Sequence, residues 1–117
     1  MMFDTFGLSR EAYALLLALY SEFKNRRKLG ESFSNAACFA DPSDVKRFIG
    51  KLMSDDDIVD LVIELSENGF ADALFCDDSF DQVMLTRSAV ERLENRFLGD
   101  LQAILKAVQS FLSLFPK

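Results

Sequence analysis

The segment from residue 54 to residue 86, SDDDIVDLVIELSENGFADALFCDDSFDQVMLT, changes its hydrophobic period halfway along. Its first half repeats apolar residues at helical spacing, between a good N-cap, Ser54, and a good stop, Gly69. These apolar positions are Ile58, Leu61, Val62 and Leu65. In its second half, short apolar stretches at residues 71–76 and 82–85 flank an acidic turn. The segment therefore predicts a helix followed by a β-hairpin.

Two further helices are predicted before this segment. Ser9 can cap the first, whose apolar residues are widely spread enough to bury it on most sides, and Gly30 can end it. Asp41 followed by Pro42 is typical of the start of a second helix. Residues 31–40 are ambiguous, since they fit either a loop or one short helix around Asn35 to Phe39.

A long helix is predicted at the C-terminus, with Thr86 as its N-cap. Its apolar residues follow a 4-3-4-3-4 spacing, namely Phe97, Leu101, Ile104, Val108, Phe111 and Phe115. A second row consists of Leu98, Leu105 and Leu112. The pair Gly99-Asp100 either breaks this helix or bends it.

The resulting fold class is mainly α with a small β-hairpin, in the order helix, helix, helix, hairpin, helix. Four stretches resemble parts of a winged helix-turn-helix domain: DPSDVKRFI the second helix, SDDDIVDLVIELSENGF the third, ADALFCDDSFDQVMLT the wing strands and LTRSAVERLENRF the helix after the wing. The last is similar to the corresponding start in MarR-like and PadR-like bacterial regulators. The resemblance implies a winged-helix domain at residues 1–97, followed by a long C-terminal helix at residues 98–117.

The charge pattern departs from that family. Residues 54–81 hold ten Asp or Glu and no Lys or Arg, within a chain of net charge −6. The resemblance places the start of the third helix and the wing tip on DNA, and these positions carry Asp55, Asp56, Asp57, Asp77 and Asp78. DNA affinity depends on Lys and Arg neutralising phosphates, so we expect duplex DNA not to bind there.

The acidic segment instead predicts a surface that binds a basic protein partner, either as a regulator-like module or as a DNA mimic. Carboxylates would attract the partner and aliphatic side chains would anchor it. The predicted protein-binding residues are Asp55, Asp56, Asp57, Val59, Asp60, Ile63, Glu64, Asp77 and Asp78. The alternative without a binding function is a helix face that is simply exposed to solvent. A second functional alternative is a DNA-binding transcription regulator that docks through Lys24, Arg26, Arg27, Lys46, Arg47 and Lys51.

The C-terminal apolar stripe has two interpretations. It either packs on the first helix and closes the domain, or joins two copies into a homodimer. The predicted dimerisation residues are Phe97, Leu101, Ile104, Leu105, Val108, Phe111 and Leu112.

Other functional classes have little support in the sequence. The chain has no His, which removes the commonest general base and metal ligand, and it lacks GxSxG, P-loop and GxGxxG motifs. We therefore expect no enzymatic activity, no cofactor and no metal. Two Cys without a framework, no signal sequence and no apolar run long enough for a bilayer predict a cytoplasmic protein that does not enter membranes.

Overall fold

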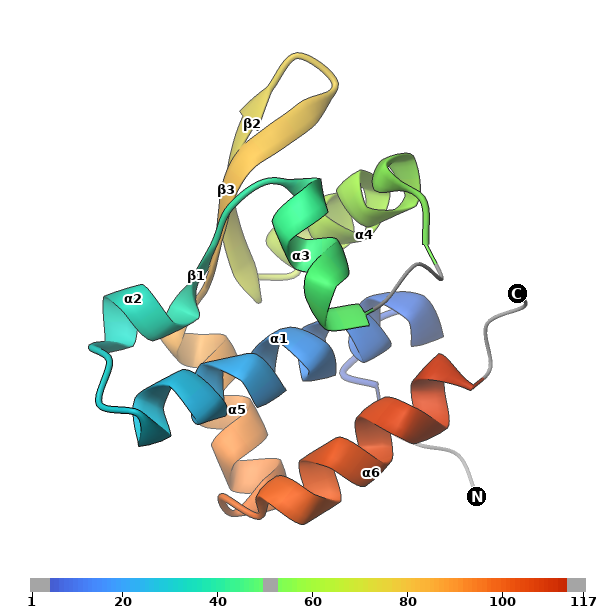
Figure 1. The fold of residues 1–117 in the computed structure, drawn as a ribbon. Coiled ribbons are helices and arrows are strands. Elements are labelled where there is room, and N and C mark those ends of the chain that lie inside the picture. The colour runs from blue at the N-terminus through green and yellow to red at the C-terminus, as the bar shows by residue number, and fades with distance from the viewer. Residues whose placement is uncertain (1–4, 50–52, 114–117) are drawn as a thin grey trace.

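The computed structural model describes residues 5–49 and 53–113 and is mainly helical with one small antiparallel sheet. Figure 1 shows α1 crossing the middle of the molecule, with α3 and α4 on one side and α6 on the other. The elements, in chain order, are α1 (Arg10–Lys28), α2 (Phe33–Ala37), β1 (Cys38–Phe39), α3 (Pro42–Ile49), α4 (Asp55–Glu67), β2 (Ala71–Cys76), β3 (Ser79–Leu85), α5 (Arg87–Phe97) and α6 (Leu101–Leu112).

The first helix, α1, forms the centre of the core. Every residue from Ala12 to Tyr20 is buried, and Phe23 is buried as well. The helix begins after Ser9, whose hydroxyl accepts a hydrogen bond from the Ala12 amide at 3.2 Å. The predicted start and the burial on most sides are therefore confirmed.

The ambiguous segment before α3 contains both a short helix and a strand. Helix α2 begins after Ser32, and β1 follows it and pairs with β3, so that Cys38 lies opposite Met84. The expected hairpin is present as β2–β3, and β1 adds to it an unpredicted third strand, so that the sheet has the order β1-β3-β2.

The start and the end of α4 match the sequence prediction. The Ser54 hydroxyl accepts from the Asp57 amide at 3.1 Å. At the other end Gly69 has a φ of +81°, which favours glycine, and the Phe70 amide bonds back to the Leu65 carbonyl at 2.9 Å. Phe70 is buried, so the chain turns directly from α4 into β2.

The β2–β3 hairpin projects away from the helices beside α4 (Figure 1). Its register skips Asp81, because Leu74 pairs with Gln82 and Phe75 pairs with Phe80. This bulge shifts the alternation of side chains along β3. Phe80 and Val83 are therefore both buried, although they lie three positions apart. The mainly helical class with a small β-hairpin is confirmed at this level, and the winged-helix assignment stays a prediction.

The expected long C-terminal helix is instead two helices. Leu98 and Gly99 both adopt positive φ, 51° and 76°, and end α5 after Phe97. Helix α6 then runs along α1 and buries Ile104 and Val108. Of the two alternatives at Gly99-Asp100, the structure shows the break, because two successive left-handed residues cannot continue a right-handed helix. Phe115 lies outside the described residues.

No helix in residues 5–49 and 53–113 combines the length and the hydropathy needed to cross a membrane.

Candidate protein-binding groove

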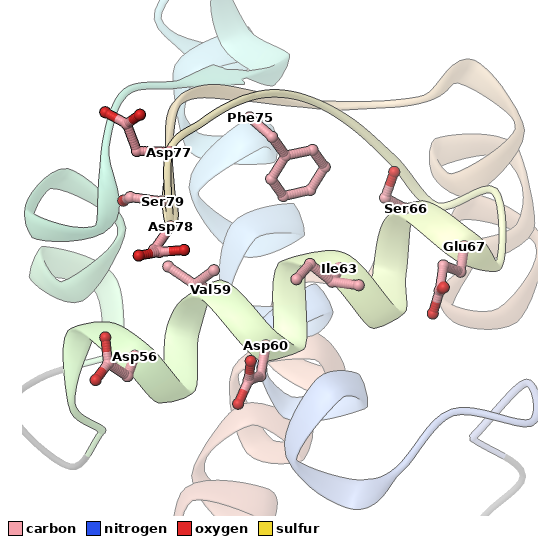
Figure 2. Close-up of a pocket in the computed structure, with 10 residues that line it drawn as sticks. All are labelled: Asp56, Val59, Asp60, Ile63, Ser66, Glu67, Phe75, Asp77, Asp78 and Ser79. Carbon is pink, nitrogen blue, oxygen red and sulfur yellow. The ribbon is translucent and has the colours of Figure 1, made fainter.

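An open groove of about 660 Å³ lies between α4 and the tip of the β2–β3 hairpin (Figure 2). Helix α4 contributes one wall and the hairpin the other. The lining residues are Asp56, Val59, Asp60, Ile63, Ser66 and Glu67 from α4, and Phe75, Asp77, Asp78 and Ser79 from the hairpin.

Helical spacing explains the α4 wall. Residues three and four positions apart share one face of a helix, so Asp56 is followed on this face by Asp60, Ile63 and Glu67. The opposite face of α4 carries Ile58 and other side chains that are buried in the core. The groove therefore uses the side of α4 that the core leaves exposed.

The floor of the groove is apolar and only partly covered. In Figure 2 the Phe75 ring points from the hairpin towards α4, opposite Ile63. Phe75 remains 46% exposed and Ile63 39% exposed. Val59 is only 8% exposed, so it is already part of the core and offers a partner little additional surface. The available apolar anchors are therefore Ile63 and Phe75.

Five carboxylates surround this floor and none of them forms an ion pair within residues 5–49 and 53–113. They are Asp56, Asp60, Glu67, Asp77 and Asp78. Asp77 and Asp78 form the two-residue turn of the hairpin, and Asp77 adopts a positive φ of 50°. Like charges held around one groove repel each other, and a bound cation would relieve this repulsion.

Three of the predicted binding residues lie outside the groove. Asp55 forms an ion pair with Lys46 of α3 at 2.7 Å, and Glu64 accepts hydrogen bonds from Ser9. Asp57 is exposed in the first turn of α4 but does not line the groove. The other six predicted residues line it together.

Sequence reasoning missed four lining residues. Ser66 and Glu67 are three and four positions beyond Ile63, so extending the same helical spacing by one turn would have found them. Phe75 could have been found from the alternation along β2, where Ala71, Ala73 and Phe75 share a face. Ser79 follows the turn and carries no distinctive signal.

The basic residues of the alternative DNA-binding surface are engaged within the chain. The Lys24 ammonium lies 2.7 Å from Glu94, and Arg47 lies 3.0 Å from Asp44. Arg26 lies 2.9 Å from Glu22, donates to the Cys38 carbonyl at 2.7 Å, and stacks over the Phe39 ring with its carbon 4.5 Å from the centroid. Lys46 pairs with Asp55 as described, Arg27 donates to the Glu31 carbonyl, and Lys51 lies outside the described residues.

The chemistry available at the hairpin tip is limited. The pKa of the exposed Cys76 thiol is raised, first by its hydrogen bond to Asp81 and further by the charges of Asp81 and Asp77. A raised pKa disfavours the thiolate, which is the nucleophilic form. Within the part of the chain that the structure describes, no three Cys, Asp or Glu side chains are arranged to hold a metal ion.

The predicted dimerisation residues differ in how far the structure buries them. Ile104 and Val108 are buried within the chain, Phe97 and Leu101 are half-buried, and Leu105 is 38% exposed. The side chains of Phe111 and Leu112 lie outside the described part. Helix α6 packs on α1, as the first interpretation expected, and homodimerisation stays a prediction.

No protein-family model, curated protein or solved structure matches this chain.

Proposed function

We propose that the protein is an interaction module whose groove between α4 and the hairpin binds a basic segment of a protein partner. The observation that carries this proposal is the combination of five carboxylates, which form no ion pair with any described residue, and a partly exposed apolar floor. The alternative of a solvated acidic face does not explain why Phe75 is exposed beside Ile63. A binding surface needs both features, because apolar anchors supply affinity and charges supply selectivity.

The two features contribute differently to binding. Covering the exposed parts of Ile63 and Phe75 would contribute roughly 1 kcal/mol each, because both side chains are already half covered. The carboxylates would mainly accelerate association with a cationic segment, and salt would screen this effect over a Debye length of about 8–10 Å. Raising the salt concentration should therefore slow association more than it changes dissociation.

We also infer that the fold is a winged helix-turn-helix, with the hairpin as its wing. The order of α1, α3, α4, hairpin and α5 supports this assignment. The groove then occupies the elements with which the resembling regulators contact DNA. Its unpaired carboxylates would repel phosphates, so the groove favours a basic protein over duplex DNA. The alternative of a regulator with a displaced basic surface has less support, because its described cations already have local partners.

A peptide titration followed by NMR tests the proposal. The probe is a synthetic peptide of alternating Lys and Leu, and its counterpart replaces each Lys with Glu. We expect the basic peptide to shift the backbone signals of Asp60, Ile63 and Phe75, and the acidic peptide to leave them unchanged. A random-sequence DNA duplex at about 50 mM salt should also leave them unchanged.

Two matched double variants test whether peptide binding depends on the groove carboxylates or only on the overall negative charge of the protein. Asp60→Asn with Asp78→Asn removes two groove charges, whereas Glu11→Gln with Glu91→Gln removes two exposed charges elsewhere. The groove variant should bind the basic peptide several-fold more weakly, and the control variant should bind like the wild type. Equal weakening in both would refute a specific site. Salt-sensitive duplex binding abolished by Arg26→Ala, Arg27→Ala, Lys46→Ala and Arg47→Ala would favour the regulator.

A further inference from the structure

A second surface, opposite in charge, lies where the C-terminal end of α1 meets the turn between α5 and α6. It contains an open concavity of about 550 Å³. Lys24, Arg27 and Lys28 line it from α1, Gly30 and Glu31 from the segment after α1, and Gly99 and Leu101 from the turn and the start of α6. Lys24 is paired with Glu94, so Arg27 and Lys28 are the cations available to another molecule. Within residues 5–49 and 53–113, Lys28 has no carboxylate at ion-pair distance. We call this surface the basic corner.

Two leucines next to the basic corner are the most exposed large apolar side chains of the described residues. Leu29 is 74% exposed and Leu98 is 85% exposed. They directly precede the lining residues Gly30 and Gly99. Leu98 also holds a positive φ of 51°, a conformation that glycine or asparagine adopts more readily. A strained and fully projecting leucine at a surface turn contributes little to the fold and is suited to a contact with another molecule.

The basic corner and the groove complement each other in two respects. Among the described residues the groove has five carboxylates without an ion pair. The basic corner has two cations without an ion pair, Arg27 and Lys28, against one carboxylate, Glu31. The groove has a recessed apolar floor at Ile63 and Phe75, whereas the basic corner has projecting leucines. The surfaces lie at opposite ends of α1, because Glu64 of α4 bonds to Ser9 at its start and Lys28 is at its end. A helix of 19 residues spans about 28 Å, so the groove and basic corner of one copy are too far apart to meet.

We propose that the basic corner of one copy docks into the acidic groove of a second copy, with Leu98 as the apolar anchor. This inference rests on the proposed function, because it names one occupant of the same groove. The contact is head-to-tail, so each copy in a chain of copies uses both surfaces. Such an interface does not close on itself by a two-fold axis, and assembly therefore extends beyond the dimer as concentration rises. Salt weakens it, because exposed charges contribute to both sides.

Charge-reversed variants test the contact through complementation. One variant blocks the basic corner with Arg27→Glu and Lys28→Glu, and the other blocks the groove with Asp60→Lys and Asp78→Lys. Each alone should be monomeric in sedimentation velocity, whereas the wild type associates at high protein concentration and about 50 mM salt. An equimolar mixture should associate again, because the first variant supplies an intact groove and the second an intact basic corner. The control Glu11→Lys with Glu91→Lys keeps both surfaces and should associate like the wild type.

Three results would overturn the proposal. Dimers of both single variants would indicate a symmetric interface, such as the predicted one along α6. Assembly of only one variant would indicate that the two surfaces do not contact each other. A wild type that stays monomeric, together with a mixture that forms no complex, would show that copies do not associate. In the last case, a basic peptide that still binds the groove would leave the proposed function intact, whereas loss of that binding as well would remove both.

A second pair of substitutions tests the same contact independently, in case charge reversal itself prevents folding. Leu29→Ser with Leu98→Asn changes only exposed side chains and no charge. It should reduce self-association at least several-fold while the circular dichroism spectrum stays that of the wild type. Unchanged self-association of this folded variant would refute the role of the leucines and the proposed contact with them.

Discussion

Glu64 of α4 accepts two hydrogen bonds from Ser9, one from its backbone amide at 2.6 Å and one from its hydroxyl at 2.9 Å. Ser9 is the N-cap of α1, and Ala12 occupies the third helical position. In a capping box that third residue is Glu or Gln and bonds back to the N-cap amide, which Ala12 cannot do. Glu64 supplies the missing carboxylate from another helix, and so fixes the start of α1 against α4.

Replacing Glu64 should therefore destabilise the fold. We expect Glu64→Ala to lower the free energy of unfolding by about 1–2 kcal/mol, because the Ser9 amide and hydroxyl both lose their acceptor. Urea unfolding at neutral pH measures this change. The control is Glu67→Ala, also on α4, where no described partner is lost. If both variants lose the same stability, the bond to Ser9 has no specific role.

The ion pair between Lys24 and Glu94 predicts that the stability of the fold depends on pH. Partial burial acts to raise the pKa of Glu94, but the hydrogen bond and charge of Lys24 outweigh it and hold that pKa below its usual range. Because the folded pKa is depressed, the contribution of Glu94 to stability is present above about pH 4.3 and is lost as the pH falls through the folded pKa. The stability difference between the wild type and Glu94→Gln should shrink between about pH 6 and pH 3.

The matched control for this titration is Glu91→Gln, on an exposed face of the same helix. Its stability difference from the wild type should stay near zero throughout. The neighbouring Tyr20 does not contribute a charge change in this range, because burial, and then the nearby Glu94 carboxylate, raise the pKa of Tyr20. A Glu94→Gln difference that is independent of pH would contradict the assignment.

Packing of α6 on α1 predicts unequal effects of two neighbouring substitutions. Ile104 is fully buried and Leu105 is 38% exposed. Ile104→Ala should cost about 2–5 kcal/mol of unfolding free energy, since it leaves a cavity beside α1. Leu105→Ala should cost less than about 1 kcal/mol, because less of its side chain is covered. Thermal unfolding of the two variants at low protein concentration compares them without a contribution from self-association.

Local signals predicted most helix boundaries, because each is fixed by contacts within a few residues. Ser9, Ser54 and Thr86 were all predicted as N-caps, and each accepts from the amide three positions on. The break at Leu98 could not be decided in the same way. Gly99 favours a helix end, but the apolar spacing continues through the break, and only the packing of α6 on α1 decides between a bend and a turn.

Contacts between distant segments were the features that the sequence did not reveal. Strand β1 has two residues and exists only because Cys38 and Phe39 pair with β3. Glu64 was predicted on the binding surface from helical spacing alone, and its bond to Ser9, 55 positions away, removes it from that surface. Six of the nine predicted binding residues nevertheless line one groove, because both walls follow from local periodicity.

Leu98 is expected to lower the stability of the fold while it strengthens self-association. Its positive φ of 51° is unfavourable for leucine, and its side chain is 85% exposed, so burial does not offset the strain. We expect Leu98→Asn to raise the free energy of unfolding by roughly 0.5–1 kcal/mol, since asparagine tolerates the left-handed conformation better. The same variant should self-associate more weakly than the wild type, because the apolar anchor is gone. Unfolding and sedimentation of one preparation measure both effects. Greater stability with unchanged association would show that the strain at Leu98 serves no contact between copies.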